Sequence, residues 1–127
     1  MQLKWLDQTN SINPTWSEGF PDKMVILDLE TTGGRAKYHR VIEIGLLVIE
    51  NGRLIDTWQS FINPETIVPS FIQKLTGIKP NMVNNAPIFA AIADKLHDKL
   101  ENRTWVAHNE RLEYSVLKSA ISRIGVT

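Results

Sequence analysis

The chain has 127 residues, of which 43% are hydrophobic and 22% are charged. This balance is typical of one folded domain and excludes an intrinsically disordered chain. Fourteen basic and fourteen acidic residues leave no net charge, so the composition does not predict a protein that coats nucleic acid through a basic surface. The chain has no cysteine, which excludes disulfide bonds and thiolate metal sites.

The first 23 residues are polar and irregular, and they predict an N-terminal arm ahead of a folded domain at residues 24–127. Trp5 and Trp16 are the exceptions in this arm. Single aromatic residues usually pack on the domain surface, and the alternative is an arm that binds a partner. No segment resembles a signal sequence or has the apolar length of a membrane span. The expected location is therefore the cytoplasm, without a membrane partner.

Three consecutive strands are expected next. Met24 to Leu29 is a nearly continuous apolar run, which is typical of a central strand covered on both faces. Residues 41–50 are rich in β-branched side chains and predict a second strand. Asn51-Gly52 is a strong hairpin signal, so residues 54–62 are expected to return antiparallel to the second strand.

The second half of the chain is expected to be mainly helical. Ser70 is expected to cap a short helix that ends at Gly77, and residues 79–87 predict a turn or another short helix. Pro87 is expected in the first turn of a longer helix over residues 88–100. A short apolar strand and a last helix follow, at residues 104–108 and 110–124.

The end of the first strand carries two carboxylates, Asp28 and Glu30. On an extended strand, residues two positions apart point to the same face. Two adjacent carboxylates repel each other and are costly to bury, and a divalent cation removes both penalties. The alternative is a solvated strand end, and the spacing alone does not decide between the two. The preceding apolar run favours a central strand, and ligands gather beyond the carboxyl ends of such strands.

Four segments in one order carry a family resemblance: VILDLETTG, RVIEIGLLVIENGRLIDTWQSFINP, IVPSFIQKLTGI and VAHN. Over residues 24–124 the chain resembles the DnaQ-like 3′→5′ exonucleases, which include RNase T and the proofreading subunit of bacterial DNA polymerase III. The resemblance implies an α/β fold with a ribonuclease-H-like mixed sheet of three N-terminal strands and a fourth, parallel strand, with flanking helices and a last helix. It also implies metal-dependent hydrolysis of phosphodiester bonds at nucleic-acid 3′ ends.

The resemblance further implies roles for individual residues. Asp28, Glu30 and Glu113 would be catalytic and would hold two divalent metal ions, either Mg²⁺ or Mn²⁺. The other implied residues would bind the substrate: Thr31, Thr32, Gly33, Leu75, Thr76, His108 and Asn109. The expected substrate is the 3′ end of single-stranded DNA or RNA, and a DNA polymerase is a candidate partner.

Two departures from the family pattern bear on activity. Glu113 stands where the family has an aspartate, and a displacement of ~1 Å in such a site can cost ~10²-fold in rate. The final strand and helix of the family, with its last metal-binding motif, are missing from the expected elements. The metal site is therefore expected to be incomplete. The alternative function is a catalytically impaired, truncated module that acts in binding or oligomerisation, and an uncovered sheet edge predicts a homodimer.

Overall fold

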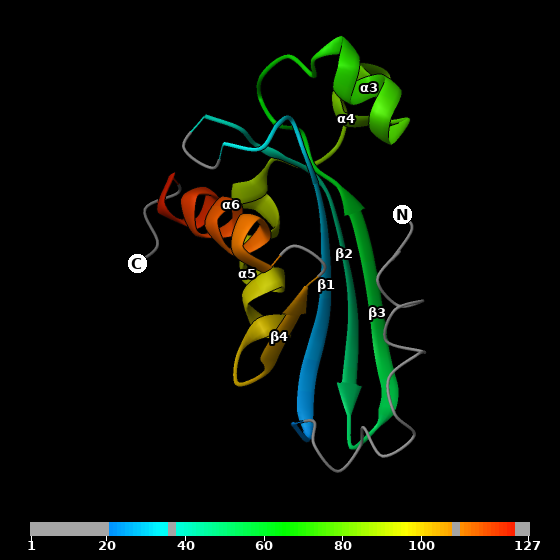
Figure 1. Cartoon of the computed structure of the whole chain (residues 1–127), viewed down its shortest axis with the longest axis vertical. Coiled ribbons are helices and arrows are strands. Elements are labelled where there is room, and N and C mark those ends of the chain that lie inside the picture. Colours follow the sequence, from blue (N-terminus) through cyan, green and yellow to red (C-terminus); the bar gives the residue numbers. More distant parts are fainter. Residues whose placement is uncertain (1–20, 36–37, 108–109, 124–127) are drawn as a thin grey trace.

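A computed structural model describes residues 21–35, 38–107 and 110–123 (Figure 1). In this part of the chain four strands form one sheet, in the order β3-β2-β1-β4. Their bounds are Lys23–Thr31 for β1, Val41–Glu50 for β2, Arg53–Phe61 for β3 and Thr104–Ala107 for β4. β1 pairs antiparallel with β2 and parallel with β4, while β2 pairs antiparallel with β3. The predicted mixed sheet of three N-terminal strands and a parallel fourth strand is confirmed.

Helices cover one face of the sheet and one of its ends. Their bounds are Ser70–Thr76 for α3, Pro80–Val83 for α4, Phe89–Leu100 for α5 and Glu110–Arg123 for α6. In Figure 1, α5 and α6 lie against one face beside β1 and β4, and α3 and α4 lie beyond the end where β1 finishes. No helix within the described residues is long and apolar enough to cross a membrane.

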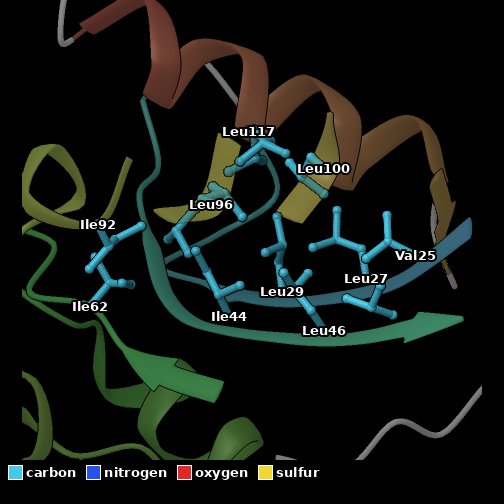
Figure 2. Packing of buried hydrophobic residues seen from close by; sticks show 13 residues of the cluster. Val25, Leu27, Leu29, Ile44, Leu46, Ile62, Ile92, Leu96, Leu100 and Leu117 are labelled. Atoms are coloured by element: carbon cyan, nitrogen blue, oxygen red, sulfur yellow. The ribbon is translucent and has the colours of Figure 1, made fainter. Parts of the chain in front are cut away.

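The largest core cluster lies between the sheet and the helices α5 and α6 (Figure 2). Alternate residues of β1, namely Val25, Leu27 and Leu29, point to this side and pack in one cluster with Leu96 of α5 and Leu117 of α6. The intervening residues of β1, Met24 and Ile26, belong to a second cluster. β1 is therefore buried on both faces, as its continuous apolar run predicted.

The turn between β2 and β3 has the predicted hairpin geometry. Asn51 and Gly52 both have positive φ, at 50° and 78°, as a two-residue hairpin turn of type I′ requires. This turn fixes the register in which β2 and β3 pair, and the register begins with Glu50 opposite Arg53.

The predicted starts of two helices are wrong. Ser70 is the first residue of α3 rather than its cap; the cap position is held by Pro69, without a side-chain capping bond. The extended backbone of Pro69 places its carbonyl to accept the N–H of Gln73, at 3.0 Å. Pro87 lies before α5 rather than in its first turn, because the Pro87 carbonyl accepts the N–H of Asn63, at 2.8 Å, and so belongs to the neighbouring segment.

Candidate active site

Asp28 and Glu30 lie near the carboxyl end of β1, on the same face of the sheet. Because side chains alternate along a strand, both share the face of Met24 and Ile26 and point away from α5 and α6. Asp28 is only 9% exposed, and Glu30 is half-buried. The predicted juxtaposition of these two carboxylates on a central strand is therefore present in the structure.

Glu43 adds a third carboxylate to this face. It is the partner of Glu30 in the β1-β2 ladder and is 4% exposed. Gln59 of β3 donates a hydrogen bond from its Nε2 to the Glu43 Oε2. Glu43 was not among the residues predicted for the site. The available signal was a charged residue within the otherwise apolar start of β2, VIEIG.

Buried polarity is concentrated at this end of β1. Within the described residues, the buried polar or charged side chains are those of Asp28, Thr32 and Glu43. Two come from adjacent strands, and Thr32 comes from the loop that directly follows β1. Carboxylate and hydroxyl oxygens of this kind are ligands that suit a divalent cation. The residues present therefore fit a Mg²⁺ or Mn²⁺ ion held by Asp28 and Glu30.

The loop after β1 is closed by two hydrogen bonds between Thr32 and Arg40. The Thr32 N–H donates to the Arg40 carbonyl at 2.8 Å, and the Arg40 N–H donates to the Thr32 hydroxyl at 2.9 Å. The Thr31 hydroxyl donates to the carbonyl of Gly33 at 2.7 Å. The predicted substrate-binding segment of Thr31, Thr32 and Gly33 is thus held in a fixed backbone conformation beside the carboxylates.

Gly33 lies against the imidazole ring of His39. A Cβ atom at position 33 would be 2.5 Å from the His39 Nε2, closer than carbon atoms approach in folded proteins. The ring is held on its other side, where the His39 Nδ1 accepts the N–H of Arg35 at 2.9 Å. A side chain at position 33 would therefore have to displace the His39 ring.

Two arginines flank the same loop on the helix side of the sheet. Arg40 and Arg123 both line a small cavity of about 150 Å³. Burial, and then the neighbouring charge of Arg40, lower the pKa of Arg123. The Arg123 Nη2 also donates to the His39 carbonyl at 3.3 Å, which connects the end of α6 to the loop.

Leu75 and Thr76 lie on α3, beyond the same end of the sheet. The Leu75 side chain is 77% exposed and is accessible to a ligand. The Thr76 hydroxyl is used inside the protein: it donates to the Ile72 carbonyl at 2.8 Å and accepts the N–H of Ile78 at 3.1 Å. Thr76 therefore closes the end of α3, and its predicted contact with substrate stays a prediction.

The remaining predicted residues are not tested by the structure. The backbone of Glu113 lies within α6, and its side chain lies outside the part of the chain that the structure describes. His108 and Asn109 also lie outside the described residues. Their roles at the site stay predictions.

A second group of possible metal ligands lies at the other end of the sheet. His97, Asp98 and Glu101 are all exposed, and their donor atoms lie within 4.8 Å of one another at the end of α5. This end of α5 leads into the start of β4, where Thr104 pairs with Met24. The group is therefore separate from the carboxylates of Asp28 and Glu30.

Three solved structures with a similar fold are those of nucleases. Exonuclease I in a complex with SSB-Ct superposes with a TM-score of 0.75 and 16% identity, over 84% of this chain and 25% of that chain. E. coli exonuclease I bound to a 5cy-dA13 oligonucleotide superposes with a TM-score of 0.73 and 17% identity, again over 84% of this chain and 25% of that chain. The nuclease domain of 3′hExo, a DEDDh family member bound to rAMP, superposes with a TM-score of 0.70 and 20% identity, over 85% of this chain and 62% of that chain. The fold is therefore ribonuclease-H-like.

Sequence relatives agree with the fold. The chain is 37% identical over 105 residues to a DNA polymerase III PolC-type of Caldanaerobacter subterraneus subsp. tengcongensis, covering 83% of this chain and 8% of that protein. It is 38% identical over 95 residues to the 3′-5′ exonuclease DinG of Staphylococcus aureus, covering 75% of this chain and 11% of that protein. The chain thus spans about a tenth of the length of these relatives. The sequence model of the RNase_T family, described as exonuclease, matches residues 25–127, and the chain therefore belongs to this exonuclease family.

Proposed function

We propose that the chain is a metal-dependent 3′→5′ exonuclease domain that hydrolyses phosphodiester bonds at nucleic-acid 3′ ends. The observation that carries the proposal is the concentration of buried polar side chains at the end of β1, with Asp28 on β1, Glu43 on the neighbouring β2 and Thr32 in the loop that follows β1. Membership of the exonuclease family and the names of the relatives support the same activity.

Asp28 and Glu30 are proposed to hold the divalent cation, with Glu113 as a further ligand from α6. Mg²⁺ and Mn²⁺ both accept carboxylate oxygens, so the ligands do not select one of them. When bound, such an ion supplies electrostatic stabilisation of the charge that develops on the reacting phosphate.

The substrate is proposed to be the 3′ end of a single strand of DNA or RNA. The loop of Thr31, Thr32 and Gly33 would hold the terminal nucleotide next to the carboxylates, because its backbone is fixed by its own hydrogen bonds. Leu75 would contact the terminal base from α3, and His108 and Asn109 would complete the substrate contacts. Similarity to a PolC-type polymerase supports a DNA polymerase as the protein partner. The cytoplasmic location stays a prediction.

Metal binding and nuclease activity test the proposal directly. Calorimetry with Mn²⁺ should show binding to the parent chain and its loss in Asp28→Ala. The same variant should lose the Mn²⁺-dependent release of mononucleotides from a 3′-labelled oligonucleotide. Asp98→Ala is the matched control, because it removes a carboxylate from the exposed group at the end of α5. This control should change neither the Mn²⁺ affinity nor the release of mononucleotides.

The alternative, a catalytically impaired module, makes a different prediction. It predicts weak or no Mn²⁺ binding and no release of mononucleotides. If Mn²⁺ binding is lost in Asp98→Ala and kept in Asp28→Ala, the proposed metal site is wrong.

A homodimer through the sheet edge is also proposed. Within the described residues, β4 pairs with β1 alone, so its other edge is open to a second copy of the chain. Light scattering at micromolar concentration should then give twice the chain mass of 14.4 kDa. A mass of one chain at that concentration would contradict the dimer.

A further inference from the structure

Two arginines from distant parts of the chain line one cavity. Arg40 ends the loop that joins β1 to β2, and Arg123 is the last residue of α6. Both line the cavity of about 150 Å³ on the helix side of the sheet. The bond from Arg123 to the His39 carbonyl joins the end of α6 to this loop (Figure 1). The two guanidinium groups repel each other, and this repulsion contributes, after burial, to the lowered pKa of Arg123.

The Arg40 side chain is held in place but not used. Its backbone is fixed, because both its N–H and its carbonyl bond to Thr32. Within the described residues, its half-buried guanidinium forms no hydrogen bond or ion pair. A guanidinium group binds the oxygens of a phosphate through two parallel hydrogen bonds, and each such bond is assisted by charge. Arg40 therefore presents donors that suit a phosphate.

The walls of the cavity strengthen such an interaction. Val41, Ile62 and Ala120 line it and are each at most 5% exposed. Apolar walls lower the local dielectric constant, so an anion is attracted more strongly beside them than in open water. The volume is about ten times the ~15 Å³ that one water molecule needs, so the cavity has room for a phosphate group.

The charge around the cavity is mainly positive. Residues 31–42 contain two arginines and one lysine and no aspartate or glutamate. Glu65 is the acidic residue among the described residues that line the cavity. Its exposed carboxylate forms no ion pair within the part of the chain that the structure describes. Glu65 therefore does not take the place of an anion between the arginines.

We propose that Arg40 and Arg123 form a binding site for a phosphate dianion, which is either inorganic phosphate or the terminal phosphate of a mononucleotide. A terminal phosphate has a second pKa of about 6 and carries two charges near neutral pH, which matches two guanidinium groups. The cavity is lined from α5 and α6, whereas Asp28 and Glu30 point away from these helices. The site is therefore separate from the proposed metal site and goes beyond the proposed exonuclease function.

Calorimetry at pH 8 in EDTA, with inorganic phosphate as the probe, tests the site without a bound cation. Arg40→Gln and Arg123→Gln should each weaken phosphate binding at least about ten-fold, because a hydrogen bond between charged groups is lost. Glu65→Gln removes a negative charge beside the cavity and should strengthen binding roughly two- to five-fold. Arg53→Gln is the matched control. It removes one positive charge at an exposed position beside the other end of β2 and should leave the affinity unchanged.

Urea unfolding separates loss of the site from loss of the fold. Phosphate should raise the stability of the parent chain and should not raise that of Arg40→Gln. Without phosphate, Arg40→Gln should be at least as stable as the parent, because the substitution removes a repulsion and keeps the backbone bonds to Thr32. Arg123→Lys keeps the charge but not the planar group, so its phosphate affinity should lie between those of the parent and Arg123→Gln.

Two further probes identify the source of the phosphate. Thymidine 5′-monophosphate should compete with inorganic phosphate, whereas an oligothymidylate without a terminal phosphate should not, because each of its phosphates carries one charge. Binding of inorganic phosphate alone would assign the site to the free ion. Displacement of phosphate by the oligothymidylate would contradict a site for a dianion.

The site and the proposed function can fail separately. In EDTA, Asp28→Ala should not weaken phosphate binding, although it should abolish the release of mononucleotides in Mn²⁺. Equal phosphate affinity in the parent, Arg40→Gln and Arg123→Gln would overturn the site, whether or not the chain releases mononucleotides. Absence of phosphate binding to the parent at millimolar concentration would overturn it as well.

Discussion

Glu43→Gln tests how charge is shared between β1 and β2. The substitution keeps the size of the side chain and an oxygen that can accept the hydrogen bond of Gln59, but it removes the negative charge. Glu43 is buried and lies directly opposite Glu30 in the ladder. Residues in such a pair have Cβ atoms about 4.5–5.5 Å apart, so the two carboxylates repel each other when no cation is bound.

The size of the effect follows from this distance. Two unit charges ~6 Å apart interact by ~0.7 kcal/mol at the dielectric constant of water and by ~3 kcal/mol at an effective value of ~20. Glu43→Gln should therefore raise the free energy of unfolding of the metal-free protein by an amount within this range. A divalent cation at the same distance is attracted twice as strongly, by ~1.4 to ~5.5 kcal/mol. The substitution should therefore weaken Mn²⁺ binding at least about ten-fold.

Two assays measure the two halves of the prediction. Urea unfolding in EDTA gives the stability of the metal-free protein, and calorimetry gives the affinity for Mn²⁺. Glu101→Gln is the matched control, because Glu101 is exposed and follows α5 at the opposite end of the sheet. It should leave the Mn²⁺ affinity unchanged and shift the unfolding midpoint little.

The opposite pattern would refute the reasoning. If Glu43→Gln lowers the stability in EDTA and leaves the Mn²⁺ affinity unchanged, Glu43 acts only as a buried hydrogen-bond acceptor for Gln59. Its charge would then have no part in the cation site.

Three further predictions concern the scaffold. Leu96→Ala, at a buried position of the main core, should lower the free energy of unfolding by about 2–5 kcal/mol in urea titrations. Gly33→Ala should cost about 1–3 kcal/mol through its clash with the His39 ring, and adding His39→Ala should recover part of this loss in a double-mutant cycle. The hydrogen bond from Lys99 lowers the pKa of Asp56 below its usual 3.8. The pair therefore stabilises the folded protein above that pH, and this stabilisation is lost as the pH falls through the pKa that Asp56 has in the folded state. Lys99→Met should therefore reduce stability slightly at pH 7, and acid titration should show the difference from the parent vanishing well below pH 3.8.

The sheet could be predicted because its signals are local and agree with one another. The apolar run of β1 predicted burial on both faces, and Asn51-Gly52 predicted the hairpin of β2 and β3. The start of α3 was missed because Pro69 holds the cap position without a side-chain capping bond. The start of α5 was missed because the carbonyl that precedes it is bonded to another segment. The Pro87 carbonyl bonds to Asn63, which is 24 positions away in sequence, and no local capping pattern contains that information.

The site could be predicted only along a single strand. The spacing of Asp28 and Glu30 places them on one face whatever their neighbours are. The contribution of Glu43 depends on the register between β1 and β2, and a slip of one residue would turn it to the other face. The irregularity between Glu30 and Thr31 shifts that register again. The loop joining the two strands carries no signal that fixes such pairing, so the third carboxylate was not predicted.

The zero net charge of the chain conceals two regions of opposite sign at one end of the sheet. Asp28, Glu30 and Glu43 gather on the face of β1 and β2, while residues 66–93, the segment around α3, contain Lys74 and Lys79 and no aspartate or glutamate. A nucleic-acid strand is attracted by the lysines and repelled by the carboxylates, so its affinity should depend on whether a cation neutralises the carboxylates. The effect of Asp28→Asn on the affinity for the strand should therefore have opposite signs without and with the cation. In EDTA the substitution removes a negative charge and should strengthen binding of a twelve-nucleotide oligothymidylate. In Mn²⁺ it removes a ligand of the cation and should weaken binding of the same oligonucleotide. For the measurement in Mn²⁺ the oligonucleotide is made with phosphorothioate linkages, which slow hydrolysis. Unchanged affinity in both buffers would mean that the strand does not approach the carboxylates, and that the cation and the nucleic acid bind independently.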